Sequence, residues 1–103
     1  MTISNKILIS KQVAPNLVTR IAADRLFRNI NKLPQKRIVI DFKDVVFMSR
    51  SFAHEYYIMK NLSKKQVNEK NMSKDLEKML TLVTDSSTYY VNTYPALKAL
   101  PMS

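Results

Sequence analysis

The sequence predicts an α/β fold: a small single layer of mostly parallel strands packed against helices. Two observations support this prediction. Residues 38–42 form an apolar run rich in β-branched side chains and bounded by charge, which is typical of a strand covered on both faces of a parallel sheet. Segments with strand character also alternate along the chain with segments of helical periodicity, as in βαβ units.

The first half of the chain predicts a strand, a helix and the central strand. We expect a short strand at residues 6–10 and a helix at residues 15–31. Pro15 suits the first position of that helix, where its missing N–H would be unpaired in any case. Pro34 should end the helix before the central strand at residues 37–42.

Beyond the central strand, a polar turn at residues 43–44 and an apolar run at residues 45–48 lead into a second helix at residues 50–62. Ser49 and Ser51 lie where the chain turns from extended to helical. The unpaired N–H groups at a helix start favour a capping serine, and Ser49 fits that position better on its pattern.

The next segment predicts a weak strand and a third helix. Residues 64–70 are charged, with Val67 as their one apolar residue, so they could form an edge strand at most. Ser73 should cap a helix at residues 74–83, and Asp75 suits the positively polarised first turn of that helix.

The chain divides into an α/β domain at residues 1–84 and a C-terminal extension at residues 85–103. Residues 88–91 could add an edge strand, and residues 96–100 predict a short helical stretch. The extension carries three tyrosines, so we expect it to be docked on the domain. It could equally be exchanged between two copies of the chain, which would form a homodimer.

The composition excludes several classes of function. The 103 residues include no cysteine, which excludes disulfides, thiolate chemistry and cysteine-ligated metals. They include no glycine, so neither a P-loop nor a dinucleotide-binding fingerprint is possible, and positive-φ positions must fall to residues such as Asn31, Asn61 or Asp44. With no signal-peptide pattern and no apolar run near the roughly 18 residues that span a bilayer, we expect a cytoplasmic protein without a membrane or cofactor.

The first predicted helix has a basic outer side. Its apolar stripe should face the core, and Arg25, Arg28 and Lys32 lie on the opposite side. Leu17 and Ile21 fall among these cations. An apolar pair ringed by cations is typical of a partner-docking patch, unless the sheet wraps far enough to bury both side chains.

The sequence contains no catalytic constellation, so we expect no enzyme. Ser51 and His54 are three residues apart on the second helix, but Glu55 points away from His54 and cannot orient it. His54 and Tyr57 face outward on that helix. Asp41 ends the central strand, where functional loops of parallel sheets collect, but it could also accept N–H bonds from the following turn.

The block from Asp41 to Glu55 carries a resemblance to a known family. An apolar strand ends in Asp-Phe, Val45 follows, and the next helix opens on Ser-x-Ser-Phe-Ala-x-Glu. This pattern resembles the core of the STAS-like domain family of unknown function, which is distantly similar to the STAS anti-sigma-factor antagonists. The resemblance covers roughly residues 13–83, with a weaker match beyond the block.

The resemblance implies a non-enzymatic regulatory module that works by partner switching. The antagonists carry a phosphoacceptor serine at this helix start, and the matching candidate here is Ser51. A phosphate there would add a charge of about −1.5 to −2 beside Arg50. The implied partner is another protein, such as a kinase-like ATPase. We expect the partner surface to comprise Ser49, Arg50, His54 and Tyr57, together with Leu17, Ile21, Arg25, Arg28 and Lys32.

The charge distribution favours an alternative function. The net charge is +9, and residues 1–40 contain eight basic residues and one acid, Asp24, hence +7. A basic half of this kind favours nucleic acid or another acidic partner, although a solvated lysine-rich surface would have the same composition. The alternative is therefore a nucleic-acid-binding or scaffold protein that uses the basic surface of residues 20–37.

Overall fold

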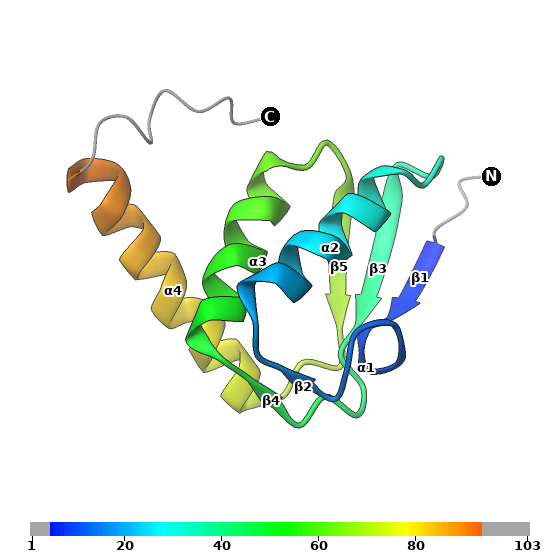
Figure 1. Ribbon diagram of the computed structural model, residues 1–103, viewed down its shortest axis with the longest axis horizontal. Helices are drawn as coiled ribbons and strands as arrows, with labels where there is room; N and C mark the ends of the chain where they lie inside the picture. The colour runs from blue at the N-terminus through cyan, green and yellow to red at the C-terminus, as the bar shows by residue number, and fades with distance from the viewer. Residues whose placement is uncertain (1–4, 94–103) are drawn as a thin grey trace.

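The computed structural model describes the backbone of residues 5–93 and the side chains of residues 5–84. The elements follow in the order β1 (Asn5–Leu8), α1 (Ile9–Gln12), β2 (Asn16–Leu17), α2 (Arg20–Asn31), β3 (Arg37–Asp41), β4 (Phe47–Met48), α3 (Arg50–Leu62), β5 (Gln66–Lys70) and α4 (Lys74–Thr93). The predicted α/β fold is confirmed, since the strands pair in parallel and the helices pack against the sheet (Figure 1).

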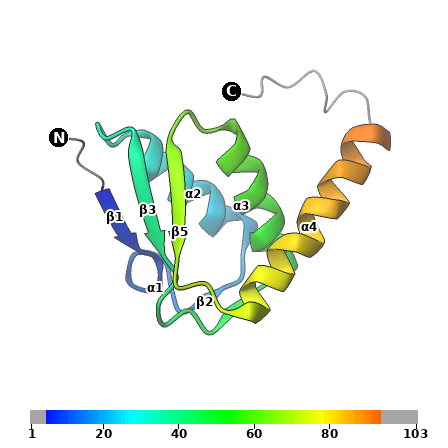
Figure 2. The ribbon, with the colours of Figure 1, turned by 180° about the vertical axis from the view of Figure 1, so that it is seen from behind.

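The main sheet contains three parallel strands in the order β1–β3–β5, so β3 is central. The chain leaves β1 toward α2 and leaves β3 toward α3. Right-handed crossovers in this strand order place both helices on the same face. Figures 1 and 2 show this arrangement, with the strands in front of the helices when the molecule is seen from behind.

Only one face of β3 is covered by the described helices. Ile38 and Ile40 are fully buried on the helix side, whereas Arg37 on the other side is exposed. The expectation of a strand covered on both faces is therefore wrong for the described part of the chain. The reason is topological, because both crossovers run in the same direction across the sheet.

The centre of the core is an aromatic cluster around Tyr56 of α3. The centroid of its ring lies 5.4 Å from that of Phe27, 5.9 Å from that of Phe42 and 6.1 Å from that of Phe52. All four side chains are at most 1% exposed. The cluster joins α2, the end of β3 and α3, and it thereby fixes the positions of both helices on the sheet.

α2 begins at Arg20, not at Pro15 as the sequence predicted. Thr19 has extended backbone angles, and its Oγ1 accepts a hydrogen bond of 3.1 Å from the N–H of Ala22. The residues before this cap form β2, which pairs in parallel with β4. The pairing buries Leu17 completely, and this burial outweighs the local preference for a helix that starts at proline.

One more predicted helix and one predicted strand are confirmed, and another strand is shorter than predicted. The helix at residues 50–62 is α3, and the weak edge strand within residues 64–70 is β5. The strand predicted at residues 6–10 ends at Leu8, because Ile9 begins α1 and is fully buried there.

The third predicted helix is longer than expected. α4 continues to Thr93, so the edge strand expected at residues 88–91 is wrong. No glycine or proline occurs in residues 74–94, and therefore no strong helix breaker interrupts the segment. The helical stretch expected at residues 96–100 lies outside the described residues.

Two turns adopt conformations that glycine usually supplies. Asp44 has a φ of 66° and Asn71 a φ of 57°, and these are the positive values among the described non-glycine residues. Asp44 was predicted on this ground, whereas Asn71 was missed and neither Asn31 nor Asn61 has a positive φ. Asp and Asn tolerate this region because their short polar side chains bond to nearby backbone groups.

Candidate functional site

The start of α3 is held in place by Ser49. Its backbone is extended, and its Oγ accepts a hydrogen bond of 3.0 Å from the N–H of Phe52. The Ser49 hydroxyl also donates to the carbonyl of Val18, and its N–H donates to the carbonyl of Leu17 at 2.8 Å. Ser49 is therefore the N-cap, as predicted, and it also ties α3 to the segment that leads into α2.

Ser51 is the second residue of α3, and its side chain is exposed. Within the described part of the chain, its hydroxyl makes no hydrogen bond. The hydroxyl thus stands at the positively polarised end of a helix, next to exposed Arg50, and contributes nothing to the cap. Ser51 was predicted at this helix start, and the structure confirms that position.

The start of α2 lies beside the start of α3. The Arg20 Nε lies 4.0 Å from Glu55 Oε1 on α3, and α2 packs along α3. His54 of α3 is half-buried, and this burial, with the positive charge of Arg20, lowers its pKa. Tyr57 packs against the core and is also half-buried. The end of the molecule around Ser51 therefore carries Arg20, Arg50 and Glu55, beside a histidine whose pKa is lowered.

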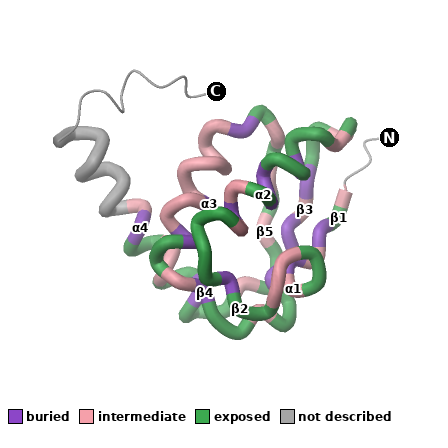
Figure 3. Tube along the Cα trace, in the orientation of Figure 1, coloured by how far each residue is buried: buried purple, intermediate pink, exposed green. Residues whose placement is uncertain are grey.

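Four exposed apolar side chains flank this cationic region, and we call them the apolar patch: Val18 (50% exposed), Ile21 (64%), Val46 (77%) and Phe47 (49%). Figure 3 shows the segment around β4 as mostly exposed. Leu17 was expected in such a patch with Ile21, but this is wrong for Leu17, which β2–β4 pairing buries completely. The other three members were missed: residues 45–48 were predicted only as an apolar run, and Val18 was assigned to the first helix.

The remaining cations of the predicted surface lie along the outer side of α2. Arg25, Arg28 and Lys32 are all exposed, and the Arg28 Nε lies 2.8 Å from Asp24 Oδ2. A helix rises about 1.5 Å per residue, so Lys32 is about 18 Å along the axis from Arg20. The structure therefore does not bring Lys32 together with Ser51.

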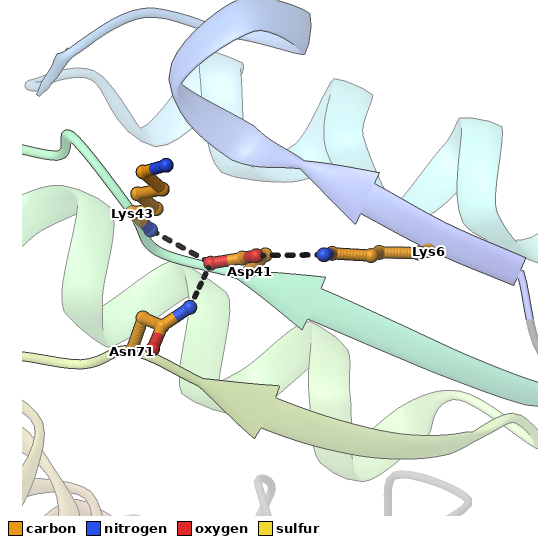
Figure 4. A network of polar contacts seen from close by, with 4 residues as sticks. All are labelled: Lys6, Asp41, Lys43 and Asn71. Atoms are coloured by element: carbon orange, nitrogen blue, oxygen red, sulfur yellow. Dashed lines mark hydrogen bonds and ion pairs between the residues drawn. The ribbon is translucent and has the colours of Figure 1, made fainter.

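Asp41 lies at the centre of a network of polar contacts with Lys6, Lys43 and Asn71 (Figure 4). Its Oδ1 accepts hydrogen bonds of 2.9 Å from the N–H of Lys43 and from Nδ2 of Asn71, and its Oδ2 lies 3.2 Å from the Lys6 ammonium. The side chain of Asp41 is only 3% exposed. These partners come from within β1 and from the segments that follow β3 and β5, and the bond from the Lys43 N–H confirms the expected role of Asp41 as acceptor for the following turn.

This network should make stability depend on pH. The hydrogen bonds from Asn71 and from the Lys43 N–H lower the pKa of Asp41 from 3.8 to about 2. Because the folded pKa is the lower one, the contribution of Asp41 is complete above pH 3.8 and is lost as pH falls through about 2. We expect Asp41→Asn to be less stable than wild type at neutral pH, and the difference in free energy of unfolding to shrink in that window.

Urea unfolding at a series of pH values measures this difference. Asp44→Asn is the matched control, since Asp44 is exposed and Asn tolerates its positive φ. A constant gap between Asp41→Asn and wild type from about pH 6 to about pH 2 would contradict the assignment.

A cavity of about 270 Å³ lies between α3, β5 and α4. Three of its polar side chains are bonded to one another: the Tyr56 hydroxyl donates to Glu69 Oε2 at 2.5 Å, and the Lys60 ammonium lies 3.2 Å from the same oxygen. The full lining comprises Tyr56, Tyr57, Lys60, Glu69, Leu80, Thr81 and Thr84. These contacts link α3 to β5, so the three side chains serve as partners for one another.

Other kinds of site receive no support within the described residues. No group of three or more His, Cys, Asp and Glu side chains gathers there with the geometry to hold a metal ion. None of the helices there is at once long enough and apolar enough to cross a membrane. Comparison of the chain with protein-family models, curated proteins and solved structures finds no match. The resemblance to the STAS-like family therefore remains a prediction.

Proposed function

We propose that the protein is a cytoplasmic, non-enzymatic interaction module that binds a regulatory protein through the start of α3. The contact surface comprises Ser49, Arg50, Ser51 and the apolar patch, with Arg20 at its border. The first partner to test is a kinase-like ATPase, which is the class that the STAS-like resemblance implies. Phosphorylation of Ser51 would switch this binding off.

The observation that carries this proposal is the division of roles between the two serines. Ser49 caps α3 and bonds to the carbonyl of Val18, while the hydroxyl of Ser51 is exposed. A modifying enzyme could therefore reach Ser51 without opening the fold. A switch needs such a residue, because its modification must change binding and leave the folded state intact.

Charge determines the direction of the switch. A phosphate adds about −1.5 to −2 charge, which the N-terminus of α3 tolerates well. Arg20 and Arg50 are exposed around the same helix start, and Glu55 already lies 4.0 Å from Arg20, so the phosphate would outweigh the net positive charge that remains there. An acidic partner surface that contacts these arginines and the apolar patch would then lose its electrostatic complement.

The experiment compares the binding of one partner by wild type, Ser51→Ala and Ser51→Asp. The partner is purified by capture on the wild-type protein, and each affinity is then measured by calorimetry. We expect Ser51→Ala to bind like wild type and Ser51→Asp to bind about tenfold more weakly, because the added negative charge offsets one positive charge at the rim of the interface. Asn68→Asp adds the same charge on the exposed side of β5 and should change nothing.

A second pair of variants tests the apolar patch. Phe47→Ser should weaken binding, whereas Leu82→Ser removes an equally exposed apolar side chain from α4 and should not. Equal affinities of wild type and Ser51→Asp would end the switch proposal. Equal affinities of wild type and Phe47→Ser would remove the patch from the interface.

A further inference from the structure

Two loops lie side by side at the end of the molecule opposite Ser51, where β3 and β5 begin. The loop after α2 covers residues 32–36 and the loop after α3 covers residues 63–65. Ser63 Oγ donates to Asn31 Oδ1 at 2.7 Å, and the N–H of Gln66 donates to the carbonyl of Lys36 at 2.8 Å. These bonds fix segments that are about 30 residues apart in the sequence into one surface.

Five cations gather on this surface, and we call them the basic cluster: Lys32, Lys36, Arg37, Lys64 and Lys65. Four are exposed and Lys65 is half-buried. Residues 25–40 and 56–68 contain no Asp or Glu at all. Among the described residues, no ion pair includes a member of the cluster, so its charge is not compensated by a neighbouring carboxylate.

The helix dipoles do not cancel this charge. α2 and α3 both end here, and each C-terminus carries about −0.5 elementary charge. The two together offset about one of the five cations, so a local charge of about +4 remains. A concentration of this size on one end of a 103-residue chain produces a field that attracts polyanions at long range.

Lys65 holds the two loops of the basic cluster together. Its ammonium donates to the carbonyl of Gln35 at 2.8 Å and to the carbonyl of Leu33, which closes the first loop against the second. An ammonium has three N–H donors, so one remains for an outside acceptor. The two loops therefore present their cations from a braced backbone, and less conformational entropy is lost when an anion binds.

We propose that the basic cluster binds the sugar–phosphate backbone of a nucleic acid. Phosphates need only cations and N–H donors, and such contacts carry no sequence information. A protein interface would require an apolar centre and few lysines, and insertion into a membrane would require apolar side chains. A purely electrostatic contact with anionic lipid is the alternative that the vesicle measurement below tests. None of the exposed large apolar side chains of the described chain belongs to the two loops.

The mode of binding follows from what the two loops contain. They carry no aromatic side chain, so they offer no platform on which bases could stack. Binding should therefore be independent of sequence and dominated by the release of counterions. This inference differs from the alternative drawn from residues 20–37 alone, because Lys64 and Lys65 supply two of the five cations.

Fluorescence anisotropy with a labelled 20-base-pair duplex and a labelled single strand tests the proposal across salt concentrations. If all five cations contact phosphates of the duplex, the logarithm of the binding constant should fall against the logarithm of salt with a slope of about −4.5. Lys36→Glu/Lys64→Glu should weaken binding at least about tenfold and reduce the size of the slope by about 2.

The control variant is Lys11→Glu/Lys78→Glu, which changes the net charge equally at exposed positions on α1 and α4. Equal loss in both double variants would show that only net charge matters and would overturn the proposal. Absence of binding at low salt, or tighter binding of polyglutamate or of phosphatidylserine vesicles, would overturn it as well. Ser51→Asp should retain nucleic-acid binding, so this result is independent of the partner switch.

Discussion

Replacement of Tyr56 with alanine is expected to lower the free energy of unfolding by about 3–5 kcal/mol. The ring is 1% exposed and contacts Phe27, Phe42 and Phe52, so its removal leaves a cavity lined by three aromatic side chains. A small domain has about 5–15 kcal/mol of stability in total, so this single change removes a large share of it. Urea unfolding followed by circular dichroism measures the loss.

Two further variants separate the ring from its hydroxyl and keep the prediction testable if Tyr56→Ala does not fold. Tyr56→Phe keeps the ring but loses the hydrogen bond to Glu69, which should cost about 1.5 kcal/mol because the acceptor is charged. Tyr57→Ala truncates the half-buried neighbour and should cost less than Tyr56→Ala. A larger loss in Tyr57→Ala would contradict the central role of Tyr56.

The hydroxyl of Tyr56 also predicts an alkaline signature. Burial and the negative charge of Glu69 raise its pKa well above 10.0 in the folded state. Because the folded pKa is the higher one, this contribution is complete below pH 10.0 and is lost as pH rises beyond it. The stability difference between wild type and Tyr56→Phe should therefore shrink in strongly alkaline solution.

Local sequence signals were sufficient to predict the helices and strands whose ends are determined by residues within or next to them. α3 was predicted with its observed bounds, because Ser49 supplies a cap and the following residues follow helical periodicity. β3 was predicted because its run of β-branched residues favours a strand over a helix. β5 was predicted less firmly, since its exposed charges hide the strand, and pairing with β3 is what defines it.

Elements that depend on distant pairing were not predictable in the same way. β2 is two residues long and exists only because β4, thirty-one residues later, lies beside it. Leu17 is consistent with a helix or a strand when read alone, and its burial decides the outcome. The apolar patch was missed for the same reason, since a two-residue strand leaves Val46 and Phe47 exposed.

The same distinction between local and distant signals applies to the two candidate surfaces, the start of α3 and the basic cluster. Ser51 was predicted to present its hydroxyl at the helix start, and the structure shows it exposed there beside the cap at Ser49. The basic cluster required the parallel register of Arg37 with Gln66, which brings Lys64 and Lys65 beside Lys36. A charge count along the chain contains no information on that register.

Replacement of Ser49 with alanine is expected to lower the free energy of unfolding by about 2 kcal/mol. Loss of an N-cap costs about 1 kcal/mol, and loss of the hydrogen bond to the Val18 carbonyl adds about 1 kcal/mol. Ser51→Ala is the matched control and should change stability by less than about 0.5 kcal/mol, since its hydroxyl is exposed. Thermal and urea unfolding of both variants measure the two changes in the free energy of unfolding.

The stability of the two variants shows whether Ser49 alone caps α3 or whether Ser51 contributes to the cap as well. If Ser49→Ala is destabilised and Ser51→Ala is not, the fold needs one hydroxyl and leaves the other available for modification. If Ser51→Ala loses as much stability as Ser49→Ala, Ser51 is part of the cap, and a phosphate there would unfold the start of α3. Partner switching would then act through local unfolding, and the surface-charge mechanism proposed above would be wrong.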